Sequence, residues 1–297
     1  MGRIVTPGQG IPWLIKYAGA ACAVQSRGNN QQYDLLITGR DCRNRSRIGK
    51  AILDLTTLNV TYDYDANSVI DLGEVGAFDE NGTAYPWLVQ VGSERLLYYV
   101  GWMPTKIAPF QNHIGLAKMT SNLQFQRISR APILERTDDE PYSTGSCCVL
   151  HENNMFKMWY TSFLGWRKKQ NRYEPKYLIK YAESANGINW RRDGLCCIDF
   201  EDSTEFAICR PSIIYSNEKY HMWYCVRGET YHLGYAFSDD GIQWNRRDDL
   251  LKFQKSGDKW DSKSCCYPFV FNHENHLYML YSGNNYGQGG LGLAKLE

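Results

Sequence analysis

Four acidic residues occur at matching places along the chain and have the chemistry that glycosidic bond cleavage requires. They are Asp79 in AFDENG, Glu140 in TDDEPYSTG, Glu205 in EDSTEFAICRP and Asp261 in KWDSKSCCYP. Cleavage needs one protonated carboxyl group for the leaving oxygen and one ionised carboxylate, and crowding raises the pKa of one of them. The repetition predicts a catalytic cluster, although each acid alone is equally well explained as a turn cap or as the partner of an arginine.

A second group of residues has the chemistry of sugar binding. Aromatic faces stack on sugar rings, while arginine and asparagine form several hydrogen bonds to hydroxyl groups or a carboxylate. The candidate binding residues are Arg40, Asp41, Trp102, Trp166, Arg210, Arg227, Asp261, Tyr267 and Asn284. Because a buried arginine is costly without a partner, we expect a ligand anion or Glu205 to pair with Arg210.

A long internal repeat positions both groups. Segments 20–41, 84–102, 145–166, 209–228 and 266–285 each combine an apolar strand, a polar turn and a second strand rich in aromatic or aliphatic residues. The second strands align on Ile37, Tyr99, Tyr160, Tyr224 and Tyr281, with successive spacings of 62, 61, 64 and 57 residues. Third strands follow at 113–119, 177–184, 231–238 and 291–297. Asn186-Gly187 and Asp240-Gly241 then mark turns into fourth strands at 186–194 and 240–249.

Four strands in each of five units predict an all-β protein, a single five-bladed β-propeller with four antiparallel strands per blade that occupies residues 1–297 as one domain. The last unit ends after its third strand, so we expect residues near Ile4 to Leu14 to supply its fourth strand and close the ring. In a propeller the first strands begin at one rim of the central channel, and the loops between second and third strands return to it. The candidate residues are therefore expected to converge.

Composition and motifs exclude several other classes of function. The 33 Lys and Arg residues nearly balance the 32 Asp and Glu residues, which argues against nucleic acid or an anionic membrane as a partner. The chain has no apolar run of signal-peptide or membrane-spanning length, and its vicinal cysteine pairs do not suit ordinary disulfides. No zinc, phosphate-loop or serine-hydrolase motif occurs. We expect a cytoplasmic protein that takes a carbohydrate or sugar-containing small molecule, with no metal and no cofactor; its oligomeric state stays open.

Four segments carry a family resemblance that covers nearly the whole chain and is most specific in the last two blades. They are FDENGTAYPWLV, ICRPSIIY, YHLGYAFSDDGIQWNRRDD and CCYPFVFNHENHLYMLYSGNNYGQGGLGLA. The chain resembles the five-bladed propeller superfamily of glycoside hydrolases, which includes family 43, the family 32 invertases and levansucrases, and the family 130 mannoside phosphorylases. It is most similar to an uncharacterised branch associated with bacterial surface polysaccharides.

The resemblance implies roles for particular acids. Family 43 enzymes use an Asp as general base, a second Asp that adjusts its pKa and orientation, and a Glu as general acid. By position in the repeat, Asp79 corresponds to the base or nucleophile and Glu140 to the acid, while Glu205 and Asp261 compete for these roles or bind hydroxyl groups. The first repeat departs from this pattern, since no acid precedes its first strand. We therefore predict a glycoside hydrolase or a related glycosyl-transferring enzyme that acts on a bacterial-type carbohydrate through these acids. A non-catalytic carbohydrate-binding propeller and a phosphate-dependent glycoside phosphorylase are the alternatives.

Overall fold

Antiparallel strands rich in aromatic and β-branched residues form almost the whole structure, as expected for residues that favour pleated sheets. The computed structural model describes residues 1–26, 28–62, 68–121 and 124–296. One four-stranded sheet contains β2 (Ala18–Gln25), β3 (Gln32–Arg40), β4 (Ser46–Asp54) and β5 (Val60–Tyr62). The next contains β6 (Thr83–Val91), β7 (Glu94–Pro104), β8 (Phe110–Met119) and β9 (Phe125–Arg127).

An eight-stranded sheet follows and consists of two antiparallel sets. The first set contains β10 (Thr144–Glu152), β11 (Met155–Lys169), β12 (Arg172–Ser184) and β13 (Cys196–Ile198). The second contains β14 (Ala207–Ser216), β15 (Lys219–Arg227), β16 (Tyr231–Ser238) and β17 (Asn245–Arg246), with the 3₁₀ turn η1 (Asp248–Leu250) after it. The parallel pairing of Tyr177 with Ala207 links β12 to β14. The sheet is therefore continuous at the level of hydrogen bonds.

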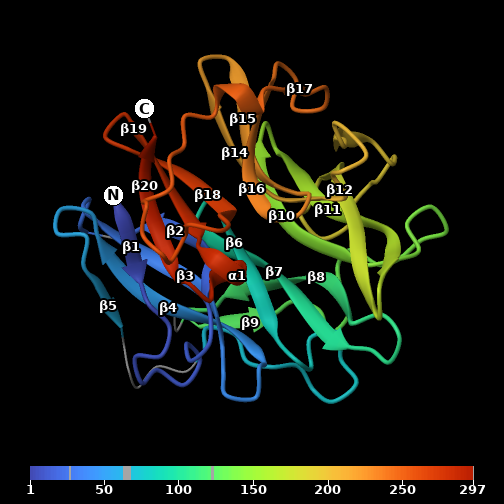
Figure 1. Ribbon diagram of the computed structural model, residues 1–297, viewed down its shortest axis with the longest axis horizontal. Helices are drawn as coiled ribbons and strands as arrows, with labels where there is room; N and C mark the ends of the chain where they lie inside the picture. Colours follow the sequence, from blue (N-terminus) through green and yellow to red (C-terminus); the bar gives the residue numbers. More distant parts are fainter. Residues whose placement is uncertain (27, 63–67, 122–123, 297) are drawn as a thin grey trace.

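Both ends of the chain belong to one sheet. It contains β18 (Cys266–His273), β19 (His276–Ser282), β20 (Leu291–Leu296) and β1 (Gly2–Val5), with α1 (Asn284–Gly287) between β19 and β20. Gly2 pairs with Leu293 and Val5 with Leu291, so the two termini lie side by side (Figure 1). The predicted closure by an N-terminal strand is confirmed. The strand covers residues 2–5 rather than 4–14, because the chain turns inward after Val5 and buries Leu14 in the core.

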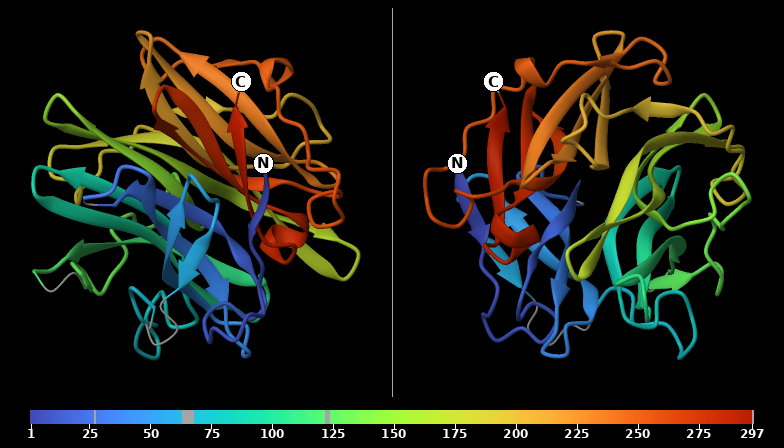
Figure 2. Two further views of the ribbon diagram at one scale, coloured as in Figure 1. Left: turned by 90° about the vertical axis from the view of Figure 1, so that its left-hand side faces the viewer. Right: turned by 45° about the vertical axis from the view of Figure 1, so that its right-hand side comes forward.

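The first strand of each antiparallel set lies near the centre of the molecule. In Figure 1, β2, β6, β10, β14 and β18 surround the middle, while β5 and β17 lie toward the outside. The right-hand view of Figure 2 shows the sheets following one another around the molecule. Contacts between these inner strands run in a closed order, from β2 through β6, β10, β14 and β18 back to β2. This is the arrangement of a β-propeller.

Bulges in the inner strands aim side chains toward the centre. The pairing with the second strand shifts register between Gly19 and Cys22 in β2, and equivalent shifts occur in β6, β10, β14 and β18. In four of these bulges a non-glycine residue has a positive φ angle: Ala20, Tyr85, Arg210 and Tyr267. Because a bulge re-aims the side chains of a strand, these positions face the centre of the molecule rather than the neighbouring sheet.

Turns between third and fourth strands connect adjacent sheets. Gly187 and Gly241 have φ angles of 72° and 78°, and their carbonyl groups accept hydrogen bonds from Tyr98 (2.9 Å) and Trp159 (2.7 Å) of the preceding strand set. The prediction that both dipeptides form structural turns is confirmed. The fourth strand expected at 186–194 is wrong: β13 lies later, at 196–198, because the segment before it forms only an isolated bridge from Arg191 to Glu183.

All ten cysteines are free. Neither α1 nor any other helix in the described ranges has the length and apolar character of a membrane span.

We predict that stability falls between pH 6.5 and 4 because of His113 in β8. The side chain is buried, and burial together with Arg136 lowers its pKa to about 4. In the unfolded chain the imidazole takes up a proton near pH 6.5, so the stabilisation is complete above this pH and is lost as the pH falls toward about 4. The expected loss is on the order of 3 kcal/mol. Urea denaturation of wild type and His113→Gln at pH 7, 5.5 and 4.5 measures it, and parallel curves would contradict the assignment.

Candidate functional site

A cavity of about 390 Å³ opens where the inner strands begin. Its wall combines residues from the beginnings of inner strands, such as Tyr85 of β6, with residues from the ends of second strands, such as Arg40 of β3 and Trp102 of β7. The volume lies in the range of about 300–1,000 Å³ that is typical of small-molecule sites. The rim expected from propeller geometry is therefore where the molecule is hollowed.

Aromatic rings form much of the cavity wall. The aromatic lining residues are Tyr17, Tyr85, Trp102, Phe110, Phe163, Tyr177, Tyr231, Tyr267 and Tyr286. Several of these rings brace one another: Tyr85 and Tyr267 meet edge to face at 5.0 Å, and Tyr231 meets Tyr286 at 5.7 Å. Rings that support each other in this way present fixed faces to a ligand.

Two tyrosine hydroxyl groups meet inside the cavity. The hydroxyl groups of Tyr177 and Tyr231 contact each other, and the thiol of Cys209 lies 4.0 Å from the hydroxyl oxygen of Tyr231. Burial raises the pKa of both tyrosines well above the usual value. Both therefore stay neutral at physiological pH and offer O–H groups that donate and accept hydrogen bonds.

Arg40 enters the cavity between two aromatic residues. Its guanidinium carbon lies 5.3 Å from the ring centre of Tyr17 and 4.9 Å from that of Trp102. Nη1 donates to the carbonyl oxygen of Asn44 at 3.1 Å, and the indole N–H of Trp102 donates to Oγ of Ser46 at 2.6 Å. Both large side chains of this wall are thus held in place from behind.

Arg227 lies on the β15 side of the cavity. Its guanidinium group rests near the rings of Tyr231 and Tyr286, at 5.5 and 6.0 Å, and its Nη2 atom is 3.3 Å from Glu174. Glu174 also pairs with Arg167 at 2.9 Å and Arg172 at 3.2 Å, so this one carboxylate is shared among several cations.

The predicted base, Asp79, does not belong to the cavity wall. Its side chain is 1% exposed and accepts hydrogen bonds from the hydroxyl group of Tyr99 at 3.0 Å and from Nε of Arg127 at 2.8 Å. Gly101 and Gly115 pack closely around this group, since a Cβ atom at either would collide with Phe78, Tyr99 or Asp79 itself. Asp79 thus lies in the loop before β6 and is enclosed against residues of β7 and β9.

The predicted acid, Glu140, is engaged in the same way. Its carboxylate accepts hydrogen bonds from Tyr160 at 2.9 Å, from Ser162 at 3.0 Å and from Arg192 at 2.7 Å, and Lys180 lies 2.8 Å away. Burial raises the pKa of Glu140, but the hydrogen bond and charge of Lys180, together with the hydrogen bonds of Tyr160 and Ser162, outweigh it and hold the pKa below its usual value. A general acid needs the opposite shift, because it must carry its proton at neutral pH.

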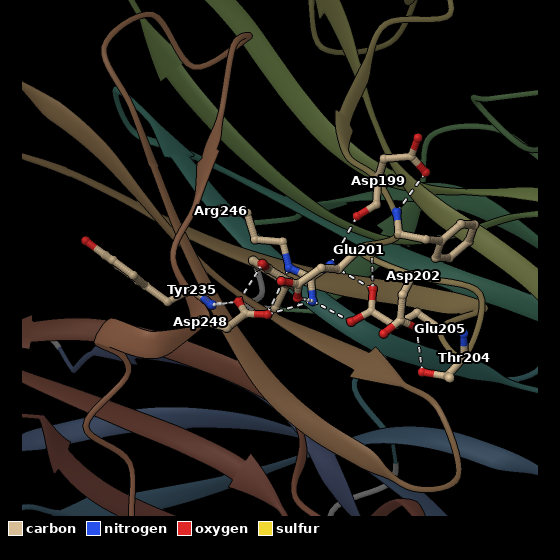
Figure 3. A network of polar contacts seen from close by, with 10 residues as sticks. Asp199, Glu201, Asp202, Thr204, Glu205, Tyr235, Arg246 and Asp248 are labelled. Carbon is tan, nitrogen blue, oxygen red and sulfur yellow. Dashed lines mark hydrogen bonds and ion pairs between the residues drawn. The ribbon is translucent and has the colours of Figure 1, made fainter.

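Glu205 takes part in a network of acidic and basic residues, shown in Figure 3, that joins Arg246 of β17 to Asp248 and the backbone of Tyr235 in β16. Arg246 makes two hydrogen bonds to Glu205, of 2.6 and 2.7 Å, and two to one oxygen of Asp248, of 2.7 and 2.9 Å. The other oxygen of Asp248 accepts from Tyr224 at 2.7 Å. Burial raises the pKa of Glu205, but Arg246 lowers it overall. The expected pairing of Glu205 with Arg210 is wrong, because Arg246 already occupies both of its oxygens.

Three of the four acids recur with a buried tyrosine that needs an acceptor, namely Asp79 with Tyr99, Glu140 with Tyr160 and Asp261 with Tyr281; in the remaining set Tyr224 donates to Asp248 rather than to Glu205. Asp261 completes the pattern, with the hydroxyl group of Tyr281 at 3.0 Å and that of Ser256 at 2.8 Å. The aligned position of the first repeat is Ile37, which has no hydroxyl group, and no acid precedes that strand. A buried hydroxyl group without a partner is costly, so tyrosine and carboxylate occur together and are absent together. The expected convergence of these acids on one pocket is therefore not what the structure shows.

Arg210 lies beneath the cavity rather than in its wall. The side chain is 0% exposed. Its guanidinium group donates to the carbonyl oxygens of Ala21 (2.9 Å), Pro86 (3.1 Å) and Tyr85 (3.3 Å), and it lies 5.7 Å from the ring of Trp87. The positive φ angle of the β14 bulge sends this side chain across the centre to β2 and β6.

Three other predicted binding residues also lie outside the wall. Asp41 accepts hydrogen bonds from Arg45 (2.9 Å) and Arg47 (2.6 Å) and stabilises the loop between β3 and β4. Trp166 packs behind the wall, edge to face with Phe110 at 5.1 Å. Asn284 accepts from the backbone N–H groups of Lys263 and Ser264 and fixes the loop before β18.

The cavity brings together Arg40, Trp102, Arg227 and Tyr267 from the predicted set. Several lining tyrosines were missed, although the repeat contains a signal for them. Tyr85 and Tyr267 occupy the same place in the segments AYP and CYP, and Tyr177 and Tyr231 each begin a third-strand segment. Aligning the residues that begin strands, as well as the acids between strands, identifies these positions.

Comparison of sequences finds close relatives of full length. No family model matches the chain. It is 35% identical over 297 residues to the uncharacterised protein Rv1502 of Mycobacterium tuberculosis strain ATCC 25618 / H37Rv, covering 100% of this chain and 98% of that protein. The uncharacterised protein MT1551 of strain CDC 1551 / Oshkosh is similar to the same extent, at 35% over 297 residues.

Comparison of structures finds glycoside hydrolases at low sequence identity. A protein described as a glycoside hydrolase has a TM-score of 0.73 at 16% identity, with 99% of this chain and 90% of that one covered. A thermostable family-43 glycoside hydrolase has a TM-score of 0.70 at 15% identity, covering 95% and 90%. The family-32 β-fructofuranosidase BmSUC1 of Bombyx mori has a TM-score of 0.68 at 10% identity, covering 99% and 62%. These likenesses show the fold.

Proposed function

The chain belongs to the family of the mycobacterial protein Rv1502 and has the propeller fold of family-43 and family-32 glycoside hydrolases, and from its cavity we propose that it is a carbohydrate-binding protein. The observation that carries the proposal is the composition of the cavity wall. Tyrosine, tryptophan, arginine, asparagine, serine and threonine line it, and no Asp or Glu does so among the described residues.

The wall matches the chemistry of a sugar. Aromatic faces such as Trp102 and Tyr85 suit the C–H faces of a pyranose ring, while hydroxyl and amide groups suit its hydroxyl groups. Asn112 of β8 and Thr161 of β11 supply such groups to the wall. A few polar groups within a mainly apolar wall fix the orientation of a ligand, which is how specific small-molecule sites are built.

The acids support binding more than hydrolysis. Two-carboxylate hydrolysis needs carboxyl groups about 5–5.5 Å apart for retention, or roughly 6.5–9.5 Å apart for inversion, on either side of the scissile bond. Asp79, Glu140 and Glu205 each bond to a tyrosine network or an arginine away from the cavity wall. In this proposal they are structural acids, and the chain keeps the fold of the hydrolases without their acid and base.

Hydrolysis and phosphorolysis are the alternatives that the first experiment tests. Hydrolysis would require Asp79 or Glu140 to reach a substrate, and phosphorolysis would require Arg40 or Arg227 to hold inorganic phosphate. Calorimetric titration of the purified protein with mono- and oligosaccharides, followed by product analysis with and without phosphate, separates them. We expect saturable binding without product. Product formed in water supports the hydrolase, product formed only with phosphate supports the phosphorylase, and no binding of any sugar contradicts the proposal.

We predict that Trp102→Ala weakens sugar binding about tenfold. Loss of the indole ring removes a stacking face and also the support for Arg40 on this wall; stacking of this kind contributes about 0.5–1.5 kcal/mol beyond burial. Titration of wild type and variant with the same sugar measures the effect. Tyr215→Ala, which removes an exposed aromatic ring on β14, is the matched control and should bind normally. Equal affinities of Trp102→Ala and wild type would contradict the site.

We also infer that residues 1–297 form one five-bladed unit. The support is the closed order of inner-strand contacts, in which β10 and β14 occupy equivalent places although hydrogen bonds join their sheets. In this interpretation the eight-stranded sheet is two blades, and the pairing of Tyr177 with Ala207 is a local bridge between them.

A further inference from the structure

We propose that the ligand of this cavity is an acidic carbohydrate, a sugar with a carboxylate or phosphate group, and that Arg40 binds the acidic group. The inference rests on the proposed function, since it names the class of sugar that the same cavity takes. Three observations carry it: a positioned arginine with no acidic partner, an excess of positive charge around the cavity, and a basic hairpin at the rim.

Arg40 is held in place but its charge is not neutralised. No Asp or Glu of the described residues forms an ion pair with it, in contrast to Arg45 and Arg47, which both pair with Asp41. Its one described hydrogen bond is from Nη1 to the carbonyl oxygen of Asn44. A guanidinium group has five N–H donors in a rigid plane that matches a carboxylate or phosphate in two-point contact. Its remaining donors are therefore available to an anion in the cavity.

A second unneutralised cation lies below the cavity. Arg210 is fully buried, and its described partners are carbonyl oxygens and the ring of Trp87, none of which carries a formal negative charge. Ser146, which lines the cavity, accepts a hydrogen bond from the backbone N–H of Arg210 at 3.1 Å, so the two residues are adjacent. The guanidinium group itself donates to the carbonyl oxygen of Tyr85, another lining residue, at 3.3 Å. The charge of Arg210 therefore lies behind the cavity wall, and because this side chain is fully buried, water screens it little.

The rim adds further positive charge. The long hairpin of β11 and β12 contributes Phe163, Pro175 and Tyr177 to the wall, and its outer part is basic. Its cations are Arg167, Lys168, Lys169, Arg172 and Lys176, against the single carboxylate of Glu174, which Arg227 also shares. A cleft lined by one sign of charge attracts ligands of the other sign and raises their association rate. The net charge of +1 for the whole chain is thus distributed unevenly, with an excess of cations at the cavity.

The experiment compares acidic sugars with their neutral parents. Methyl glycosides of glucose, galactose and mannose, the three corresponding uronic acids and the three 6-phosphates are titrated into wild type, Arg40→Gln and Arg43→Gln at low and high salt. Arg43 is an exposed neighbour whose side chain lies outside the cavity wall, so Arg43→Gln removes the same charge without touching the site. Thermal melting of each variant verifies that it is folded.

We expect at least one acidic sugar to bind tenfold or more tightly than its neutral parent, with an affinity that falls at high salt. Arg40→Gln should abolish this preference, so that acidic and neutral sugars bind to it with similar affinity, while Arg43→Gln should keep the preference of wild type. The uronic acids and the 6-phosphates distinguish a carboxylate from a phosphate ligand. If neutral sugars bind as tightly as acidic ones, or if Arg40→Gln keeps the preference, the inference is overturned and the proposed function stands. If no sugar binds, the proposed function itself fails.

Discussion

Replacement of Arg210 by alanine is expected to lower the free energy of unfolding by more than about 4 kcal/mol, which is enough to unfold many domains. The truncation leaves a cavity at the centre of the molecule, where the side chain is 0% exposed. It also removes the donors for three buried carbonyl oxygens, those of Ala21, Tyr85 and Pro86. These carbonyl groups belong to β2 and β6, so the substitution removes the hydrogen bonds that link β14 to two other inner strands.

Two further variants separate packing from hydrogen bonding. Arg210→Met keeps most of the volume and removes the charge, so it should destabilise less than Arg210→Ala but still leave the carbonyl groups without donors. Arg43→Ala removes an exposed arginine and should change the free energy of unfolding by less than about 0.5 kcal/mol. Equilibrium denaturation in urea measures all three. If Arg210→Ala were as stable as wild type and lost only ligand binding, Arg210 would be a binding residue, as its position in the sequence suggested.

Glu140→Gln and Asp79→Asn are expected to destabilise the protein by about 1–3 kcal/mol each while leaving its affinity for sugar unchanged within about twofold. Each amide replaces a buried carboxylate that accepts from a tyrosine and balances a cation, namely Arg192 and Lys180 for Glu140 and Arg127 for Asp79. An amide keeps one acceptor oxygen, but its NH₂ group then faces a donor and the cations lose their partner. The cavity wall is not touched.

A double-mutant cycle identifies the structural bond directly. Tyr160→Phe should lose about 1 kcal/mol in wild type and clearly less when Glu140 is already Gln, because the two changes remove one shared hydrogen bond. Glu94→Gln, which breaks an exposed ion pair with Lys118, is the matched control with little expected effect. The opposite result, in which the acid variants are as stable as wild type but lose turnover of a sugar, would restore the catalytic interpretation of these acids.

The repeat allowed much of the fold to be predicted. The aligned positions Ile37, Tyr99, Tyr160, Tyr224 and Tyr281 lie directly opposite Gly49, Gly115, Lys180, Gly234 and Gly292 of the third strands, so the alignment matches the observed register. The missing fourth strand at the C-terminus correctly indicated that the N-terminus completes the last sheet. These predictions succeeded because alternation and turn residues are local properties that recur in every copy.

The site was predicted less well, for a reason that the acids illustrate. Asp79, Glu140 and Asp261 recur in the repeat, and recurrence was taken as convergence on one pocket. Each of these three acids instead accepts a hydrogen bond within its own sheet, because that sheet buries a tyrosine that needs an acceptor. A contact that is repeated within several copies looks the same in the sequence as a site that the copies build together.

The sequence by itself determined the class of fold, the length of the repeat and the closure of the ring, since hydrophobic period and turn chemistry are encoded within each short segment. It also determined that aromatic and basic residues stand at strand ends, where Arg40, Trp102, Arg227 and Tyr267 are found in the cavity. Only the tertiary structure decided which way each polar side chain points. A bulge with a positive φ angle directs the side chain of Arg210 across the centre of the molecule, and hydrogen bonds from buried tyrosines hold acids such as Asp79 outside the cavity wall. Both outcomes depend on partners that are distant in the chain, so the sequence of one short segment does not determine them.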